Sequence, residues 1–169
     1  MNMKKLSMAL TTLFGIGLLI FNSCGTVPIT GRRQLNLVSD GEILAASATQ
    51  YRQFISKSQL SHNSTYNNKV TQVGRRLAAA TNIYLKQNGY ESMLSTLSWE
   101  FNVVDSKQVN AFCMPGGKIV VYTELLNLVG NGGHSDDELA AVMGHELSHA
   151  LAKHANERIS NQMLMQAGG

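Results

Sequence analysis

The pentapeptide at residues 145–149, His-Glu-Leu-Ser-His, constrains this sequence more than any other feature. Side chains four residues apart project from one face of an α-helix, so both imidazoles can reach the same metal ion. Glu146 directly follows the first histidine, where its carboxylate can hold and deprotonate a water molecule beside that ion. The motif therefore predicts one Zn²⁺ per chain, with His145 and His149 as metal ligands and Glu146 as the catalytic residue of a zinc peptidase.

The flanking residues predict the helix that this motif needs. Ser135 and Glu138 form the pattern of a capping box, and the acidic residues of that first turn suit the positive end of a helix dipole. A buried helix that carries two histidines by chance is the alternative, but it does not account for a glutamate directly after the first of them. Apolar residues recur along the segment at steps of three and four, namely Leu139, Val142, Met143, Leu147, Ala150 and Leu151.

The N-terminus has the pattern of a bacterial lipoprotein signal. Lys4 and Lys5 precede an apolar run at residues 6–21, which is too short and too lightly flanked for a membrane-spanning helix. Cys24 follows a small residue, so we expect residues 1–23 to be removed and Cys24 to carry acyl chains that bind a membrane. An ordinary secretory signal and an uncleaved anchor are the alternatives. The pattern predicts a lipoprotein of the bacterial cell envelope that faces the periplasm.

The rest of the sequence is long enough for one domain with its own core. Residues 24–38 contain a proline and a glycine and are interpreted as a linker, which leaves residues 39–169 as the domain. Without the two signal lysines, twelve basic residues balance eleven acidic ones, and no basic stripe with interleaved aromatic residues occurs. We therefore expect no nucleic-acid partner. Cys113 has no partner if Cys24 is acylated, which excludes a disulfide framework.

Hydrophobic periodicity predicts an α+β fold that is mainly helical. It also predicts a small antiparallel sheet ahead of the helix that carries His145 and His149, which we call the metal helix. A second capping box, from Ser39 to Glu42, begins a helix that runs to about Ile55. From Trp99 the apolar period changes from helical to alternating, and a Pro-Gly-Gly turn interrupts the strand-like residues. The other expected elements are a helix at 70–81, an ambiguous segment at 83–91 with an Asn-Gly turn, strands at 99–103, 109–113 and 118–122, and a short helix at 123–129.

Residues 110–117, Asn-Ala-Phe-Cys-Met-Pro-Gly-Gly, are followed after a short gap by the metal helix, and together they resemble one family of enzymes. The chain is similar to the zinc endopeptidases of metallopeptidase family forty-eight, the group of the HtpX, Oma-type and CAAX-prenyl proteases. Residues 30–37, Thr-Gly-Arg-Arg-Gln-Leu-Asn-Leu, resemble the mature N-terminus of its secreted lipoprotein branch. The resemblance covers residues 24–165, which is nearly the whole mature chain.

The resemblance implies a zincin-like domain of the gluzincin type and a metalloendopeptidase that hydrolyses peptide bonds of proteins. It assigns the zinc ligands and the general base to the same residues as the motif does. The strand around Asn110, Ala111 and Phe112 would border the cleft, where an extended polypeptide substrate can pair with its backbone. The same residues can also be no more than sheet core and a turn. The family further suggests quality control of envelope proteins as the role.

A catalytic zinc takes three protein ligands and a water, and the motif supplies two of them. The resemblance places the third ligand on a glutamate of a later helix, beyond Gly169. Nearer acidic residues do not fit: on a continuous helix Glu157 lies about 12 Å beyond His149, and Glu138 lies about two turns before His145. We therefore expect the sequence to be the N-terminal part of a longer chain, with an incomplete domain that is inactive on its own.

A third histidine, His154, follows the motif on what the sequence predicts to be the same helix. Nine helical steps of about 100° place it opposite His145, so we interpret it as structural rather than as a ligand. Two other functions stay open here: a non-catalytic lipoprotein that binds polypeptides or a metal on a peptidase-like scaffold, and a structural envelope protein with an accidental motif. The match at residues 110–117 argues against the second.

Overall fold

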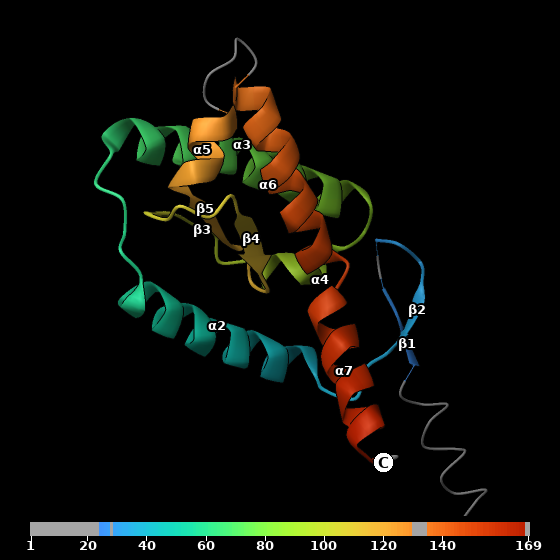
Figure 1. Ribbon diagram of the computed structural model, residues 1–169. Helices are drawn as coiled ribbons and strands as arrows, with labels where there is room; N and C mark the ends of the chain where they lie inside the picture. Colours follow the sequence, from blue (N-terminus) through green and yellow to red (C-terminus); the bar gives the residue numbers. More distant parts are fainter. Residues whose placement is uncertain (1–23, 28, 130–134, 168–169) are drawn as a thin grey trace, which may run out of the picture.

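The structure is a computed structural model that describes residues 24–27, 29–129 and 135–167 (Figure 1). It is mostly helical with small sheets, which is the α+β class that the periodicity predicts. In chain order the elements are β1 (Cys24–Thr26), β2 (Arg33–Leu35), α2 (Asp40–Lys57), α3 (Ser64–Gln87), α4 (Glu91–Leu94), β3 (Glu100–Val104), β4 (Ala111–Met114), β5 (Lys118–Tyr122), α5 (Thr123–Val129), α6 (Ser135–Leu151) and α7 (His154–Ala167). Within these residues, no helix is both long enough and apolar enough to cross a membrane.

Side-chain caps begin the two long N-terminal helices. Ser39 Oγ accepts a hydrogen bond from the Glu42 backbone N–H at 3.3 Å, and the Glu42 carboxylate accepts one from the Ser39 N–H at 3.0 Å, which confirms the predicted capping box. Asn63 caps α3 by accepting from two N–H groups of its first turn. α3 is longer than the apolar pattern indicates and takes in most of the ambiguous segment. It ends at the predicted turn, where Gly89 has a φ of 77°.

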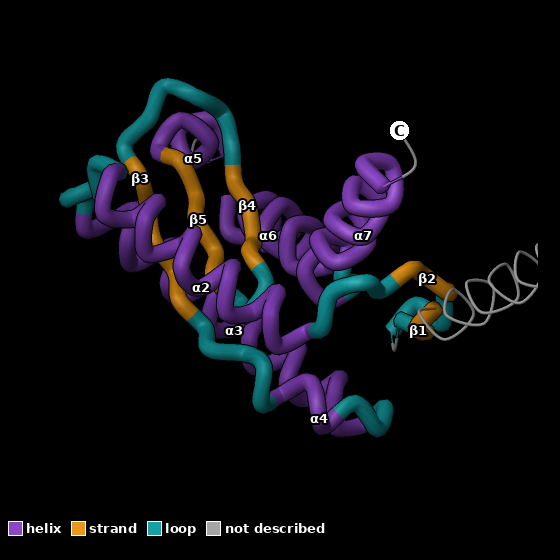
Figure 2. The backbone as a smooth tube through the Cα atoms, turned by 90° about the horizontal axis from the view of Figure 1, so that it is seen from below, coloured by secondary structure: helices purple, strands orange, loops and turns teal. Residues whose placement is uncertain are grey.

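The three-stranded sheet has the order β3-β5-β4 and is mixed (Figure 2). β4 and β5 form an antiparallel hairpin about the Pro-Gly-Gly turn, whereas β3 pairs with β5 in parallel, with Val104 opposite Tyr122. The expectation of a wholly antiparallel sheet is therefore wrong for β3. An alternating pattern marks a strand but does not choose its neighbours. β5 lies in the centre because residues 119–121 are apolar and are buried on both faces of the sheet.

Helices cover both faces of this sheet. α2 crosses one face, and α3, α5 and α6 pack on the other (Figure 1, Figure 2). The larger core lies on the second face and is formed by Val70, Val73, Val103, Ala111, Ile119, Val121, Leu125, Leu126, Val129, Leu139 and Met143. The smaller core lies under α2 around Tyr51, Val104 and Val120. This arrangement holds α6 directly against β4.

α3 approaches β3 closely at Gly74. A Cβ atom at this position would collide with the ring of Phe101, so the helix can lie this near to the strand only because the residue is glycine. Val70 and Val73 on the same part of the helix are almost fully buried. The contact fixes α3 on the sheet, and α6 then packs against α3.

Residues 24–38, interpreted from the sequence as a linker, contain a small antiparallel hairpin of β1 and β2. The hairpin is held to α7, because Arg32 forms a bidentate ion pair with Glu157 at 2.6 and 2.8 Å. The backbone N–H of Leu37 also donates to Ser160 Oγ at 3.0 Å. The segment is thus packed on the domain in this structure, and its role as a linker stays a prediction.

The metal helix ends at Leu151, earlier than its sequence indicates. α7 begins at His154 after a break in which Lys153 adopts a left-handed φ of 55°. The expectation that Glu157 and His154 lie on the metal helix is therefore wrong. Neither glycine nor proline marks the break, so the sequence has no stop signal that could locate it. At the other end, α6 begins at Ser135, the residue predicted as the N-cap, and the predicted capping box stays a prediction.

Candidate active site

α6 presents the two motif histidines on its exposed face. The opposite face is anchored in the core by Leu139, Met143 and Leu147, which are 0%, 0% and 4% exposed. His145 and His149 are therefore both turned outward, one helical turn apart. Their Nε2 atoms lie 3.1 Å apart, and their rings meet edge to face with centroids 4.6 Å apart. The structure thus brings the two predicted ligands together.

The separation of these two nitrogens suits a zinc ion. Zn–N bonds of about 2.0–2.1 Å in a tetrahedral arrangement hold two ligand nitrogens about 3.3 Å apart. The side chains of His145 and His149 need only a small adjustment to share one ion. Among the described residues, no group of three His, Cys, Asp or Glu side chains could hold a metal. A third ligand beyond Gly169 stays a prediction.

Glu146 is half-buried, and its charge acts on Cys113 of β4. Burial raises the pKa of the Cys113 thiol to about 12, and the negative charge of Glu146 adds to the rise. The carboxylate directly follows the first motif histidine, where it can take a proton from a water molecule beside the two imidazoles.

β4 is an edge strand, because among the described residues it pairs with β5 alone. The Tyr122 N–H donates to the Asn110 carbonyl at 3.0 Å, so Asn110 and Phe112 turn their backbone groups toward β5. The backbone groups of Ala111 and Cys113 therefore point to the open edge. An extended peptide can add there as a further strand.

The three predicted substrate-binding residues do not share one environment. Ala111 is 8% exposed and belongs to the core that includes α6. Phe112 lies on the other face of the sheet, where its ring packs edge-on against Phe54 at 5.2 Å and Tyr122 at 6.3 Å. Asn110 precedes the strand. The segment therefore offers a substrate its backbone rather than these three side chains.

His154, interpreted from the sequence as structural, lies beside the motif. The break between α6 and α7 brings its Nδ1 atom to 2.8 Å from Nδ1 of His149. On one continuous helix His154 would lie opposite His145, and the break is what brings it to His149 instead. The preceding residue, Lys153, is not a type that signals a left-handed conformation, so the sequence contains no clear signal for this contact.

Comparison with known proteins assigns the chain to a family. The sequence model of Peptidase family M48 matches residues 64–168, which is more than half of the chain. This protein belongs to Peptidase family M48. The M48 match begins with α3 and includes the mixed sheet, the metal helix and α7, but it does not include the N-terminal hairpin or α2. The family inferred from residues 110–117 and the histidine motif is therefore confirmed.

Eukaryotic and bacterial M48 proteases are similar to this chain. Mitochondrial metalloendopeptidase OMA1 of Schizosaccharomyces pombe is 31% identical over 86% of this chain and 40% of its own length. The OMA1 protein of Arabidopsis thaliana is 47% identical over 46% of this chain and 15% of its own length. Beta-barrel assembly-enhancing protease of Escherichia coli is 23% identical over 83% of this chain and 26% of its own length. The chain thus spans less than half the length of these relatives.

Outside the M48 match, Cys24 is the first described residue and begins β1, where its backbone pairs with Leu35. Acylation of Cys24 stays a prediction.

Proposed function

We propose that this protein is a zinc-dependent metalloendopeptidase that hydrolyses peptide bonds of polypeptide substrates. The observation that carries the proposal is the 3.1 Å approach of His145 Nε2 and His149 Nε2 on a helix that also presents Glu146 and packs against the edge strand β4. Membership of Peptidase family M48 and similarity to two kinds of protease support it. A scaffold that only binds polypeptides has no need of a general base beside paired ligands.

In this proposal His145 and His149 bind the metal through neutral Nε2 atoms, and a third ligand from outside the described residues completes the set. When bound, zinc lowers the pKa of water and polarises a peptide carbonyl. Glu146 accepts a proton from the attacking water and returns it to the departing amine. The backbone of Ala111 and Cys113, at the open edge of β4, aligns the substrate as an extended strand beside α6.

The proposed location is the bacterial cell envelope, with Cys24 acylated and the domain facing the periplasm. The basic residues Lys4 and Lys5, the apolar run after them and the position of Cys24 support this location. One relative is named a β-barrel assembly-enhancing protease, from Escherichia coli. That likeness supports envelope proteins as the substrates and their quality control as the role.

Glu146→Gln in the native protein, purified at its full length, tests the proposed function. The amide keeps the shape of the side chain but accepts no proton, so cleavage of an unfolded protein such as casein should fall by about 100- to 10,000-fold. Zinc content, measured by inductively coupled plasma mass spectrometry, should stay at one ion per chain. Glu138→Gln, an exposed change on the same helix, is the control and should alter neither value. Undiminished cleavage by the Glu146 variant contradicts the proposal.

Cys24→Ser tests the lipid anchor. Serine cannot carry the thioether-linked lipid, so the variant should lose incorporation of labelled palmitate and leave the membrane fraction. Cys113→Ser, which removes the thiol of β4, is the matched control and should keep both properties. A wild-type protein that incorporates no palmitate would show that Cys24 is not acylated.

A further inference from the structure

Three histidines form a continuous row at the junction of α6 and α7. His149 is the middle member: its Nε2 lies 3.1 Å from His145 Nε2, and its Nδ1 lies 2.8 Å from His154 Nδ1. The His149 and His154 rings have centroids 4.9 Å apart and are tilted by 45°. The two nitrogens of one imidazole thus have separate partners, one inside the pentapeptide motif and one outside it.

The position of His154 fits a partner of a ligand better than it fits a ligand. The two ring nitrogens of an imidazole point in diverging directions, so a group at Nδ1 of His149 lies on the far side from a metal at Nε2. A histidine that binds a metal through one nitrogen almost always makes a hydrogen bond through the other, which fixes its tautomer and ring orientation. His154 is placed to supply that hydrogen bond.

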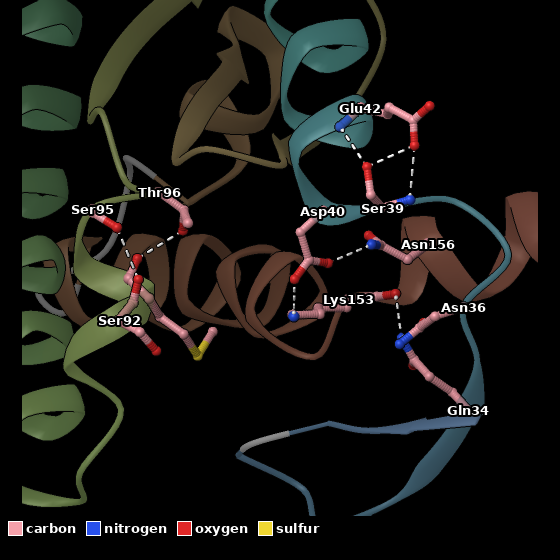
Figure 3. Close-up of polar contacts among 11 residues, drawn as sticks. Gln34, Asn36, Ser39, Asp40, Glu42, Ser92, Ser95, Thr96, Lys153 and Asn156 are labelled. Carbon is pink, nitrogen blue, oxygen red and sulfur yellow. Dashed lines mark hydrogen bonds and ion pairs between the residues drawn. The ribbon is translucent and has the colours of Figure 1, made fainter. Parts of the chain in front are cut away.

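The chain around His154 is fixed by contacts from distant segments (Figure 3). The left-handed Lys153 ends α6, and its Nζ forms an ion pair with Asp40 Oδ2 at 2.5 Å. Asp40 Oδ1 accepts a hydrogen bond from Asn156 Nδ2 at 2.9 Å, and Asn156 is 4% exposed. Gln34 Nε2 reaches the Lys153 carbonyl at 3.5 Å. A lysine with a left-handed φ is strained, and such a conformation persists only where surrounding contacts fix it. Here the contacts from α2 and the hairpin fix it.

We propose that His154 is a positioning residue for the zinc ligand His149. In the assigned arrangement, His154 Nδ1 accepts a hydrogen bond from the His149 Nδ1–H, and His149 Nε2 is left without a proton and free for the metal. The helix break at Lys153 makes this contact possible, because a continuous helix would turn His154 away from His149. The inference rests on the proposed function, since it requires zinc at His145 and His149.

The zinc dissociation constant of the native full-length protein, measured by competition with a chelator of known affinity, tests this role. His154→Leu removes the acceptor and should raise the dissociation constant about 10- to 100-fold. His154→Asp keeps an acceptor at the start of α7 and should restore most of the affinity. His62→Leu changes an exposed histidine between α2 and α3 and should have no effect. Thermal unfolding of the metal-free variants shows whether each one folds.

A second measurement does not depend on any variant. Nitrogen-15 chemical shifts of the metal-free wild-type protein distinguish the two tautomers of His149, and we expect the proton on Nδ1. A proton on Nε2 overturns the inference, as does a dissociation constant that His154→Leu leaves unchanged or that His154→Asp raises equally. A wild-type protein that binds no zinc contradicts the proposed function itself. The two failures are therefore distinguishable.

Discussion

At the scale of single residues, the surroundings of Cys113 decide its chemistry. The thiol lies partly buried on β4, and burial together with the charge of Glu146 raises its pKa to about 12. A thiolate is the reactive form of cysteine, and it is scarce at neutral pH when the pKa is this high. Cys113 is therefore a packing residue of the sheet and not a nucleophile, although it lies close to the motif.

We expect Cys113 to resist alkylation in the folded protein. At pH 8 and a pKa of about 12, about one thiol in ten thousand is ionised, so iodoacetamide should modify Cys113 far more slowly than it does in the unfolded chain. Peptide mass spectrometry after timed labelling measures both rates. In Glu146→Gln the second cause of the raised pKa is absent, and labelling should become faster. Equal rates in the folded and unfolded chains would contradict this account.

The sequence identifies the part of the site that depends on local geometry. His145 and His149 can be assigned to one face from their spacing alone, because one turn of helix relates them. His154 cannot be placed this way, since its contact with His149 depends on the backbone of Lys153 and on Asp40, which is distant in sequence. Residue spacing contains no information about a contact that tertiary structure decides.

At the scale of the elements, features that a few neighbouring residues determine could be predicted, whereas those that tertiary packing determines could not. The capping box at Ser39 and the turn at Gly89 could be predicted, because each is satisfied within a few residues. The parallel pairing of β3 with β5 could not, because every apolar strand satisfies the same alternation and only the covering helices decide which one lies in the centre. The M48 match includes these strands, whereas the caps of α2 lie outside it.

Gly74→Ala should destabilise the protein by about 1–3 kcal/mol, because the added methyl group collides with the Phe101 ring and pushes α3 away from β3. Urea unfolding followed by circular dichroism measures the change. Gly41→Ala, in the first turn of α2, is the control, since a Cβ atom there meets open space. An alanine at position 74 that leaves the unfolding midpoint unchanged would show that α3 does not depend on this close contact.

At the scale of the whole molecule, segments from the two ends of the described chain are joined. The N-terminal hairpin reaches α7 through Arg32 and Glu157, and α2 reaches the junction of α6 and α7 through Asp40 and Lys153. These ion pairs connect the part of the chain that precedes the M48 match to the part that carries the metal helix. The hairpin is therefore placed to support the junction of α6 and α7.

Acid should loosen the hairpin from α7. Hydrogen bonding and charge from Arg32 hold the pKa of Glu157 below its ordinary value of 4.5. A lowered pKa in the folded state means that the contact stabilises above pH 4.5 and is lost as the pH falls through the lowered value. Hydrogen exchange of residues 24–37, corrected for intrinsic rates, should show less protection at pH 3 than at pH 7.

Glu157→Gln should give this reduced protection at pH 7 already, because the amide cannot pair with Arg32 as a charge. Arg158→Gln, an exposed change next to it, is the control and should behave as the wild type. If the Glu157 variant keeps full protection, the hairpin is held by its other contacts, such as Leu37 with Ser160.

With Cys24 acylated as proposed, the packed hairpin would set the distance between the domain and the membrane. A free segment of fifteen residues, the length of 24–38, could extend about 50 Å and let the domain move over a wide range of distances from its anchor. Because β1 pairs with β2 from Cys24 onward and Arg32 binds α7, the segment cannot extend in this way. An acyl chain on Cys24 would then hold the motif at a short and nearly constant height above the lipid headgroups. Substrates would be selected by how close to the bilayer they expose an extended segment.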